Sequence, residues 1–315
     1  MVVVLSGGAG GGRFCRGVVR ARPAPEVLVV CNSGDDLEIY GVRVCPDLDL
    51  VTFTLAGALD RERGYGLAGD TREIVAEFRR LGLDAWFDLG DRDFALCAAR
   101  TELLRAGVPL DEIAARIARA YGVEARLVPM TNTPVWTAID TDEEGRMHFQ
   151  EWWVRTRAAL PPRHVEIVGV ENAVPAPGVL EAIAQAEAVL IAPSNPVVSI
   201  GPILAVPGIR EALARTSAPI VATTPIVEGA VFRGMADTLL DAAGIEVSAF
   251  GVAGMYADLV DGFLLDERDA ADRGRIEGLG LRVGLADTVM RDDDATTRIA
   301  TDALTLAAEI AKGRA

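Results

Sequence analysis

Glycines near the start of the chain have the types and spacing of an anion-binding turn. The stretch SGGAGGGRF, Ser6–Phe14, holds five glycines in six consecutive positions. A glycine-rich turn between a strand and a helix leaves backbone N–H groups free to face a phosphate. We therefore predict phosphate contacts from Gly8, Gly10, Gly11 and Arg13. The spacing does not match a Walker loop and fits the dinucleotide fingerprint only loosely, so a tight turn that needs glycine for packing is an open alternative.

Two pairs of aspartates follow the second expected strand. Asp35 and Asp36 lie in NSGDD, and Asp47 and Asp49 follow in CPDLD. Loops after neighbouring parallel strands leave from the same edge of the sheet, so these carboxylates can lie across from the glycine turn. Magnesium takes one or two carboxylates together with substrate oxygens. Because adjacent carboxylates repel each other in a bare turn, we predict that Asp35 and Asp36 bind magnesium. One of them would also orient or deprotonate an attacking hydroxyl.

A stiff polar loop follows a later apolar strand. The stretch APSNPVVSIGPIL, Ala192–Leu204, contains three prolines, which restrict its backbone. Its Ser194, Asn195 and Ser199 offer the hydroxyl and amide groups that read a nucleobase or a ribose. A proline-rich connection with polar surface residues would give the same pattern.

Composition and charge exclude several classes of function. The 315-residue chain is half apolar and has 46 acidic against 31 basic residues, for a formal net charge of -15. This balance argues against nucleic acid as a partner, because phosphate backbones are held by clustered lysines and arginines. The four cysteines show no metal-binding spacing, which suits a reduced cytoplasm. His148 and His164 lie in expected strands and are interpreted as structural.

No stretch of the sequence has the pattern of a membrane segment. The apolar start MVVVL is too short for a signal peptide and has no basic region before it. Proline and serine interrupt the most apolar later stretch well short of a spanning helix. We therefore expect a soluble, cytoplasmic protein that binds no membrane.

Short β-branched runs alternate with longer helical patterns over most of the chain. This alternation predicts an α/β fold with a Rossmann-like, mostly parallel sheet flanked by helices. The expected buried strands are Val2–Leu5, Val27–Cys31, Val165–Val170, Ala188–Ala192, Ile220–Thr223 and Phe263–Leu265. The expected helices are Gly12–Ala21, Thr71–Leu81 with a capping threonine, Val179–Ala186, Gly208–Arg215, Gly234–Ala243 and Asp293–Lys312.

The middle third of the chain breaks this alternation. Two helical patterns span Asp91–Tyr121 with no clear strand between them. Two strand-like runs in Val135–Val154 flank the turn residues Asp142–Gly145, which predicts a β-hairpin. We assign residues 60–160 to a smaller helical and hairpin insertion, and residues 1–60 and 160–315 to the Rossmann-like, nucleotide-binding core.

Taken together, these stretches resemble one family, the 2-phospho-L-lactate transferases of coenzyme F-420 biosynthesis, in particular the form that handles phosphoenolpyruvate. The likeness spans nearly the whole chain. It is carried by GGAGGGRF, NSGDD, GVRVCPDLD, TLAGALD, LGDRDFA, HFQEWWVR, APSNPVVSIGPIL, TTPIVEGAVFRGMAD and YADLVDGFLLD. The resemblance implies a Rossmann-like core with a smaller helical part, working as a homodimer.

The resemblance also implies a reaction. A phosphoenolpyruvyl or 2-phospholactyl group would pass from a guanosine diphosphate conjugate to the terminal ribityl hydroxyl of a deazaflavin precursor. GMP would leave, and magnesium would assist. By the same resemblance, Asp35 would be the principal magnesium ligand with Asp36 beside it, and the glycine turn would face the diphosphate.

Further residues take roles from the resemblance. Ser194, Asn195 and Ser199 would hold the guanosine portion of the donor. Asp47 and Asp49 would border the pocket of the acceptor.

The chain departs from the family pattern at three places. Tyr40 and Cys97 lie in runs where the family is expected to carry histidine, and Asn132 belongs to a pair that replaces serine and aspartate. If those histidines touch substrate, the donor or the acceptor of this chain would differ.

Two functions of other classes fit parts of the pattern. An NAD(P)-dependent oxidoreductase would explain the first strand, loop and helix, but it predicts an acidic ribose-binding residue at the end of the second strand. The stretch Asn32–Asp36 fits a metal-binding loop better than a ribose-binding site. A noncatalytic regulator that binds a nucleotide sugar on the same fold is the other alternative.

Overall fold

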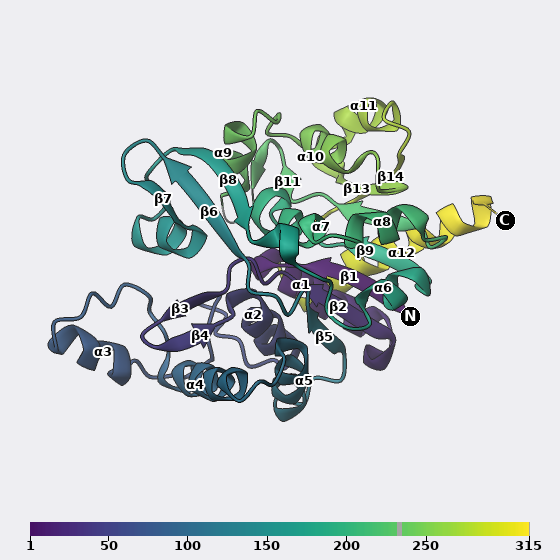
Figure 1. Ribbon diagram of the computed structural model, residues 1–315. Coiled ribbons are helices and arrows are strands. Elements are labelled where there is room, and N and C mark those ends of the chain that lie inside the picture. The colour runs from purple at the N-terminus through teal and green to yellow at the C-terminus, as the bar shows by residue number, and fades with distance from the viewer. Residues whose placement is uncertain (232–234, 315) are drawn as a thin grey trace.

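Seven parallel strands form the central sheet of the protein (Figure 1). The structure, a computed structural model, describes residues 1–231 and 235–314. The strand order is β14-β13-β10-β9-β1-β2-β5, and every neighbouring pair is parallel. The strands are β1 (Val2–Ser6), β2 (Val27–Cys31), β5 (Arg126–Pro129), β9 (Ala188–Ile191), β10 (Ile220–Thr223), β13 (Gly262–Asp266) and β14 (Arg282–Ala286). The predicted α/β, Rossmann-like fold is confirmed.

Helices cover both faces of this sheet. Side chains alternate along each strand, so Val2 and Val4 belong to one apolar cluster while Val3 and Leu5 belong to the other. The first cluster contains residues of α1 (Gly8–Ala21), α2 (Pro46–Leu55), α5 (Leu110–Ala120) and α12 (Asp293–Arg314). The second contains residues of α6 (Val179–Ala184), α7 (Gly201–Ala205), α8 (Ile209–Arg215), α10 (Ala249–Tyr256) and α11 (Arg273–Glu277).

A three-stranded antiparallel sheet lies beside the central sheet. It is formed by β6 (Trp136–Thr141), β7 (Gly145–His148) and β8 (Pro162–Val168) in the order β7-β6-β8, and the π-helix η2 (Glu151–Arg155) follows β7. The predicted hairpin is confirmed. The prediction of a fully buried strand at Val165–Val170 is wrong, because β8 is an edge strand of this small sheet and most of its residues are partly exposed.

A smaller group of elements packs on its own apolar cluster. The hairpin of β3 (Leu37–Ile39) and β4 (Val42–Val44) packs there with residues of α3 (Glu73–Arg80) and α4 (Asp91–Arg105). Helix α3 begins at Glu73, so the predicted cap at Thr71 is wrong. The carboxylate of Asp91 accepts the N–H groups of Glu73 and Ile74 at 3.1 and 2.9 Å, and it caps α3 in place of the threonine.

The remaining elements are short. They are β11 (Ile226–Val227), β12 (Ala230–Val231), α9 (Ala236–Ala242), the 3₁₀-helices η1 (Ala24–Glu26), η3 (Val170–Asn172) and η5 (Glu267–Asp272), and the π-helix η4 (Pro196–Ile200). The predicted helix Gly234–Ala243 corresponds to α9, and its first residue lies outside the described residues. Within the described ranges, no single helix is both long and apolar enough to cross a bilayer.

Two strands of the central sheet were not predicted. β14 is one edge strand of the sheet, and β5 is the other. β5 lies inside the range 60–160 that we assigned to an insertion, so this part of the range belongs to the parallel sheet.

Gly17 marks the crossing of α1 and α12. A Cβ at this position would meet the backbone carbonyl of Thr296, whereas Gly254 in α10 has no atom within 4 Å of the corresponding point. We expect Gly17→Ala to lower the free energy of unfolding by about 1 to 3 kcal/mol through overpacking. Gly254→Ala should raise it by up to about 1 kcal/mol, because alanine favours a helix over glycine. Urea unfolding measures both variants, and equal effects would contradict the close packing at Gly17.

Candidate functional site

A cavity of about 650 Å³ lies at the carboxyl ends of the central strands. Residues that follow β1, β2, β9, β10 and β14 line it, together with side chains of α2, α4 and η2. In Figure 1 the small sheet β6–β8 lies above this end of the central sheet, and β3, β4 and α3 lie below it. Most predicted site residues line this one cavity: Gly8, Gly10, Arg13, Asp35, Asp47, Asp49, Ser194, Asn195 and Ser199. Gly11 and Asp36 do not.

Most of the glycine-rich stretch belongs to helix α1 and not to a turn before it. Helix α1 begins at Gly8, four residues before the predicted start at Gly12, so most of these glycines are helical. Gly8 alone among them has a left-handed backbone, with φ of 65°. A Cβ at Gly10 would lie 2.6 Å from the carbonyl oxygen of Pro193, and one at Gly11 would meet the hydroxyls of Ser6 and Ser194. Packing therefore explains Gly10 and Gly11, while Gly7, Gly8 and Gly10 place the N-terminus of α1 at the wall of the cavity.

Two carboxylates meet beside this helix end. Asp35 follows β2, and Asp47 lies in the first turn of α2, not in a loop as the sequence suggested. Asp47 accepts the Nδ2 amide of Asn32 at 2.9 Å and the N–H of Gly8. Burial raises the pKa of Asp47 to about 6. Burial and then the charge of Asp47 raise the pKa of Asp35 well above its usual range.

Asp35 is the less satisfied of these two carboxylates. Its side chain is 4% exposed, and its Oδ1 has no hydrogen-bond partner among the described residues. The side chains of Asn32 and Thr137 relieve this carboxylate only in part, and a buried carboxylate with one oxygen left without a partner is costly in its charged form. The site therefore favours either a proton or a cation at Asp35.

Asp36 points to a different environment from its neighbour. Its Oδ2 accepts Nη2 of Arg43 at 3.3 Å and the thiol of Cys45 at 3.0 Å. Burial raises its pKa to about 6, against the lowering effect of Arg43. Consecutive residues present their side chains in different directions, so the predicted pairing of Asp35 with Asp36 around one ion has no support from this geometry.

Asp49 is held by a buried arginine. Arg100 of α4 is 2% exposed and donates both terminal nitrogens to the Asp49 carboxylate, with Nη1 at 3.0 Å from Oδ2. Nη1 of Arg100 also reaches the carbonyl of Arg43 at 3.3 Å. A bidentate pair of this kind fixes the position of the carboxylate. Asp49 thus lines the cavity as a neutralised, rigid group.

The predicted guanosine-binding loop is fastened to the glycine turn. Ser194 accepts the N–H of Gly7 at 3.3 Å and donates its hydroxyl to the Gly7 carbonyl at 2.7 Å. Oδ1 of Asn195 accepts the N–H groups of Val197 and Val198 at 2.9 and 3.3 Å, which caps η4. The Nδ2 amide of Asn195 and the hydroxyl of Ser199 are the groups of this loop that are left to meet a ligand.

His148 is structural, as predicted. Its ring stacks on Trp136 with the centroids 5.6 Å apart. Nδ1 accepts the N–H of Gln150 at 3.0 Å, so Nε2 carries the proton and donates to the carbonyl of Asp36 at 3.2 Å. Burial lowers the pKa of His148. The neutral His148 ring therefore supports the loop that carries Asp35.

The three departures from the family pattern have structural partners. Tyr40 accepts the N–H of Phe87 at 2.8 Å, and Asn132 bonds to Asp111 of α5. Cys97 is buried beside Arg100. None of the three lines the cavity.

Sequence reasoning did not single out Asp93. This residue of α4 lines the cavity and is 8% exposed. Burial, followed by the charges of Asp49 and Asp70, raises its pKa to about 7. It lies in the LGDRDFA stretch, and that motif was the available signal.

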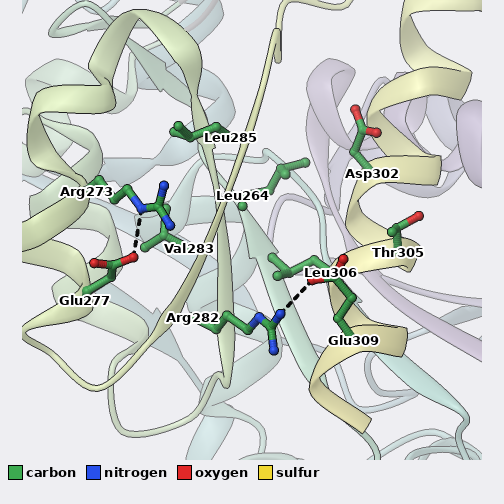
Figure 2. A pocket seen from close by; sticks show the side chains of 11 residues that line it. Leu264, Arg273, Glu277, Arg282, Val283, Leu285, Asp302, Thr305, Leu306 and Glu309 are labelled. Carbon is green, nitrogen blue, oxygen red and sulfur yellow. Dashed lines mark hydrogen bonds and ion pairs between the residues drawn. The ribbon is translucent and has the colours of Figure 1, made fainter. Parts of the chain in front are cut away.

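A second depression of about 520 Å³ lies at the β14 edge of the sheet, between α11 and α12. Figure 2 shows its two arginines paired with glutamates, Arg273 with Glu277 and Arg282 with Glu309, both at 2.8 Å. None of the predicted site residues lines it.

The unpaired carboxylate at Asp35 predicts a pH-dependent cost in stability. A carboxylate whose pKa is higher in the folded than in the unfolded protein adds stability below its unfolded pKa near 4. This stability is lost as the pH rises through the folded pKa, which is about 6 for Asp47 and above the usual range for Asp35. Asp35→Asn should therefore raise the free energy of unfolding by about 1 to 3 kcal/mol at pH 8 without divalent ions, and by less at pH 5.

Urea unfolding at both pH values with a chelator present checks this prediction. The matched control is Asp241→Asn, which changes an exposed carboxylate of α9 and should shift the unfolding free energy by less than about 0.5 kcal/mol. A variant at Asp35 that is no more stable than the wild type at pH 8 would contradict an uncompensated charge.

Comparison with known proteins identifies the family. The family model described as 2-phospho-L-lactate transferase CofD matches residues 2–281. Proteins named phosphoenolpyruvate transferase from Streptomyces avermitilis and Streptomyces coelicolor are each 47% identical over 314 residues, which covers 98% of this chain and 98% of each relative. A protein of the same name from Thermobifida fusca is 44% identical over 322 residues, with 98% of both chains covered.

A solved structure shows the same fold. A protein of the UPF0052 family from Bacillus halodurans matches with a TM-score of 0.62 at 16% identity, over 96% of this chain and 98% of that one. With a family model that spans most of its length and relatives close to half identical, the chain belongs to the 2-phospho-L-lactate transferase CofD family.

Proposed function

We propose that the protein transfers a phosphoenolpyruvyl or 2-phospholactyl group from a guanosine diphosphate conjugate to the terminal hydroxyl of a deazaflavin precursor, and releases GMP. Family membership supports a transferase of the coenzyme F-420 type. The observation that carries the proposal is the meeting of Asp35 and Asp47 with the N-terminus of α1 in one cavity. This arrangement suits a group transfer that needs charge neutralised around a diphosphate.

The donor diphosphate belongs at the start of α1. N–H groups of the first helical turn and the partial positive charge of the helix end stabilise anions, and Arg13 lines the same wall. Asp47 already accepts the N–H of Gly8 there. A diphosphate and this carboxylate repel each other, so they can share the helix end only with a cation between their charges.

Magnesium fits these carboxylates. Among the described residues no three acidic, histidine or cysteine side chains converge on one point, but magnesium takes one or two carboxylates and completes its shell with water and substrate oxygens. Asp35, with an unpartnered buried oxygen, and Asp47 beside it would hold the ion. When bound, it neutralises charge on the phosphoryl oxygens. This set replaces Asp36 with Asp47 in the predicted pair.

The protein's own part in the transfer is positioning and proton removal. Phosphoryl transfer demands an attacking oxygen in line with the leaving group. The Nδ2 amide of Asn195 and the Ser199 hydroxyl would hold the guanosine portion near the helix end. Asp35 would orient or deprotonate the acceptor hydroxyl, because its carboxylate lines the cavity beside the helix end where the diphosphate belongs. Asp36 does not line the cavity and has no direct part.

The oxidoreductase alternative meets an obstacle at the end of β2. A dinucleotide site predicts an acidic side chain there that is free to bind a ribose. Asn32 occupies this position, is fully buried, and donates to Asp47 and to the carbonyl of Val198 at 3.2 Å.

A homodimer in the cytoplasm remains part of the proposal, and light scattering of the purified protein tests the dimer.

Product analysis tests the reaction. Purified protein, the deazaflavin alcohol, magnesium and each guanosine conjugate in turn should yield GMP and one phosphodiester product, identified by mass spectrometry. Asp35→Asn should lower turnover by at least about a hundredfold with saturating magnesium, while Asp241→Asn should match the wild type. Binding of a conjugate without any product would favour the noncatalytic regulator, and Asp35→Asn turnover near wild type would remove Asp35 from the mechanism.

Magnesium binding distinguishes the two possible carboxylate pairs. Magnesium should raise the melting temperature of the wild type at pH 8, and Asp35→Asn and Asp47→Asn should each abolish this rise, because a ligand that binds only the folded state stabilises it. Asp36→Asn should keep it, since Asp36 faces Arg43 and Cys45. A lost response in Asp36→Asn together with a normal response in Asp47→Asn would restore the pair predicted from the sequence.

A further inference from the structure

Two exposed aromatic side chains lie at the same cavity. Tyr65 is 47% exposed and Trp153 is 37% exposed, and both line the cavity that holds the carboxylates. The other large apolar side chains that are exposed among the described residues are aliphatic, and none of them lines it: Leu81, Leu83, Val174 and Leu285. Exposed aromatic surface of this kind marks a binding site for a ligand with a complementary flat face.

Trp153 is presented by a rigid support. The residue before it, Trp152, is fully buried, and its Nε1 donates to the carbonyl of Leu160 at 2.8 Å. The ring of Trp152 also packs on Phe149 with the centroids 6.0 Å apart. Both tryptophans belong to the π-helix η2, a rare element that occurs often at functional sites. Because Trp152 is locked in the core, the helix holds Trp153 at the cavity.

Tyr65 comes from a separate, tightly closed turn. The N–H of Asp60 donates to the carbonyl of Gly66 at 2.9 Å, and the N–H of Gly64 donates to the carbonyl of Asp60 at 2.8 Å. Gly64 and Gly66, on either side of Tyr65, have left-handed backbones with φ of 78° and 71°. The buried Leu67 anchors the end of the turn. Tyr65 therefore lies at the tip of a turn that is fixed on both sides.

Three further aromatic side chains line the same cavity: Phe53, Phe87 and Phe149, from three separate segments of the chain. The cavity thus combines the carboxylates and the helix end with aromatic side chains for which the transfer chemistry has no use.

We propose that Tyr65 and Trp153 grip the planar fused ring of the acceptor by stacking, and so determine the specificity for a flat heteroaromatic alcohol. The inference rests on the proposed function and assigns a part of the cavity that the transfer chemistry leaves unused. The guanine base of the donor is the other flat group in the reaction. The polar loop at Asn195 and Ser199 suits its hydrogen-bonding edge better than the aromatic region does.

Binding measurements with the deazaflavin alcohol alone and with GMP alone test the proposal. Isothermal titration calorimetry with the deazaflavin alcohol alone should show Kd raised by about 5- to 150-fold in Trp153→Leu and in Tyr65→Leu, the range found for aromatic stacking. Trp153→Phe and Tyr65→Phe keep a ring and should stay within about threefold of the wild type. Kd for GMP should not change in any of them. Leu83→Ala, which alters an exposed side chain away from the cavity, is the matched control.

Kinetics separate this inference from the reaction itself. In the leucine variants KM for the acceptor should rise by the same factor as Kd, with little change in kcat. Product formed by the leucine variants at an unchanged KM would overturn the inference and leave the proposed function standing. Deazaflavin binding that depends on the two rings, without any product, would support the inference and contradict the proposed function. A loss that falls on GMP binding would assign the rings to the donor base and overturn the inference.

Discussion

A buried carboxylate without a positive partner is the constraint on which the rest of the site depends. Asp35 is almost fully enclosed, and the charge of Asp47 lies beside it. Asp47 gains some relief from the N–H of Gly8 and the end of α1, whereas Asp35 is relieved only by the side chains of Asn32 and Thr137 and keeps its Oδ1 without a partner. Folding therefore costs free energy at this point, and the large apolar core on both faces of the sheet offsets it. In the proposed function, a cation and an anionic substrate would return that free energy on binding.

The acidic residues divide into two groups by their surroundings. Asp36 accepts one contact from Arg43 at 3.3 Å, and Asp49 accepts both terminal nitrogens of the buried Arg100, which ties α4 to the start of α2. Asp35 faces the cavity without an arginine partner. An arginine stays charged at every working pH, and a bidentate pair fixes the position of the carboxylate. Asp36 and Asp49 are therefore neutralised by the protein itself, whereas Asp35 is not.

The elements outside the central sheet supply the aromatic side chains of the cavity. The sheet edge supplies polar groups and backbone N–H donors, as the carboxyl ends of parallel strands usually do. The aromatic side chains come from the turn at Tyr65, from α2 and from the segment around η2. One cavity can therefore accept a ligand that is charged at one part and flat and apolar at another.

Periodicity and motif spacing alone determined the α/β class, five strands of the central sheet, the hairpin of the small sheet and nine of the residues that line the cavity. Val27–Cys31, for example, is an apolar run that only a doubly covered strand would use. The short edge strands β5 and β14 were missed, because edge strands need little apolar patterning. Only the tertiary structure shows that Asp35 and Asp47 line one cavity while Asp36 faces Arg43 and Cys45. Adjacent side chains share no direction, and the partner of a buried charge is set by packing between distant elements, which local sequence does not encode.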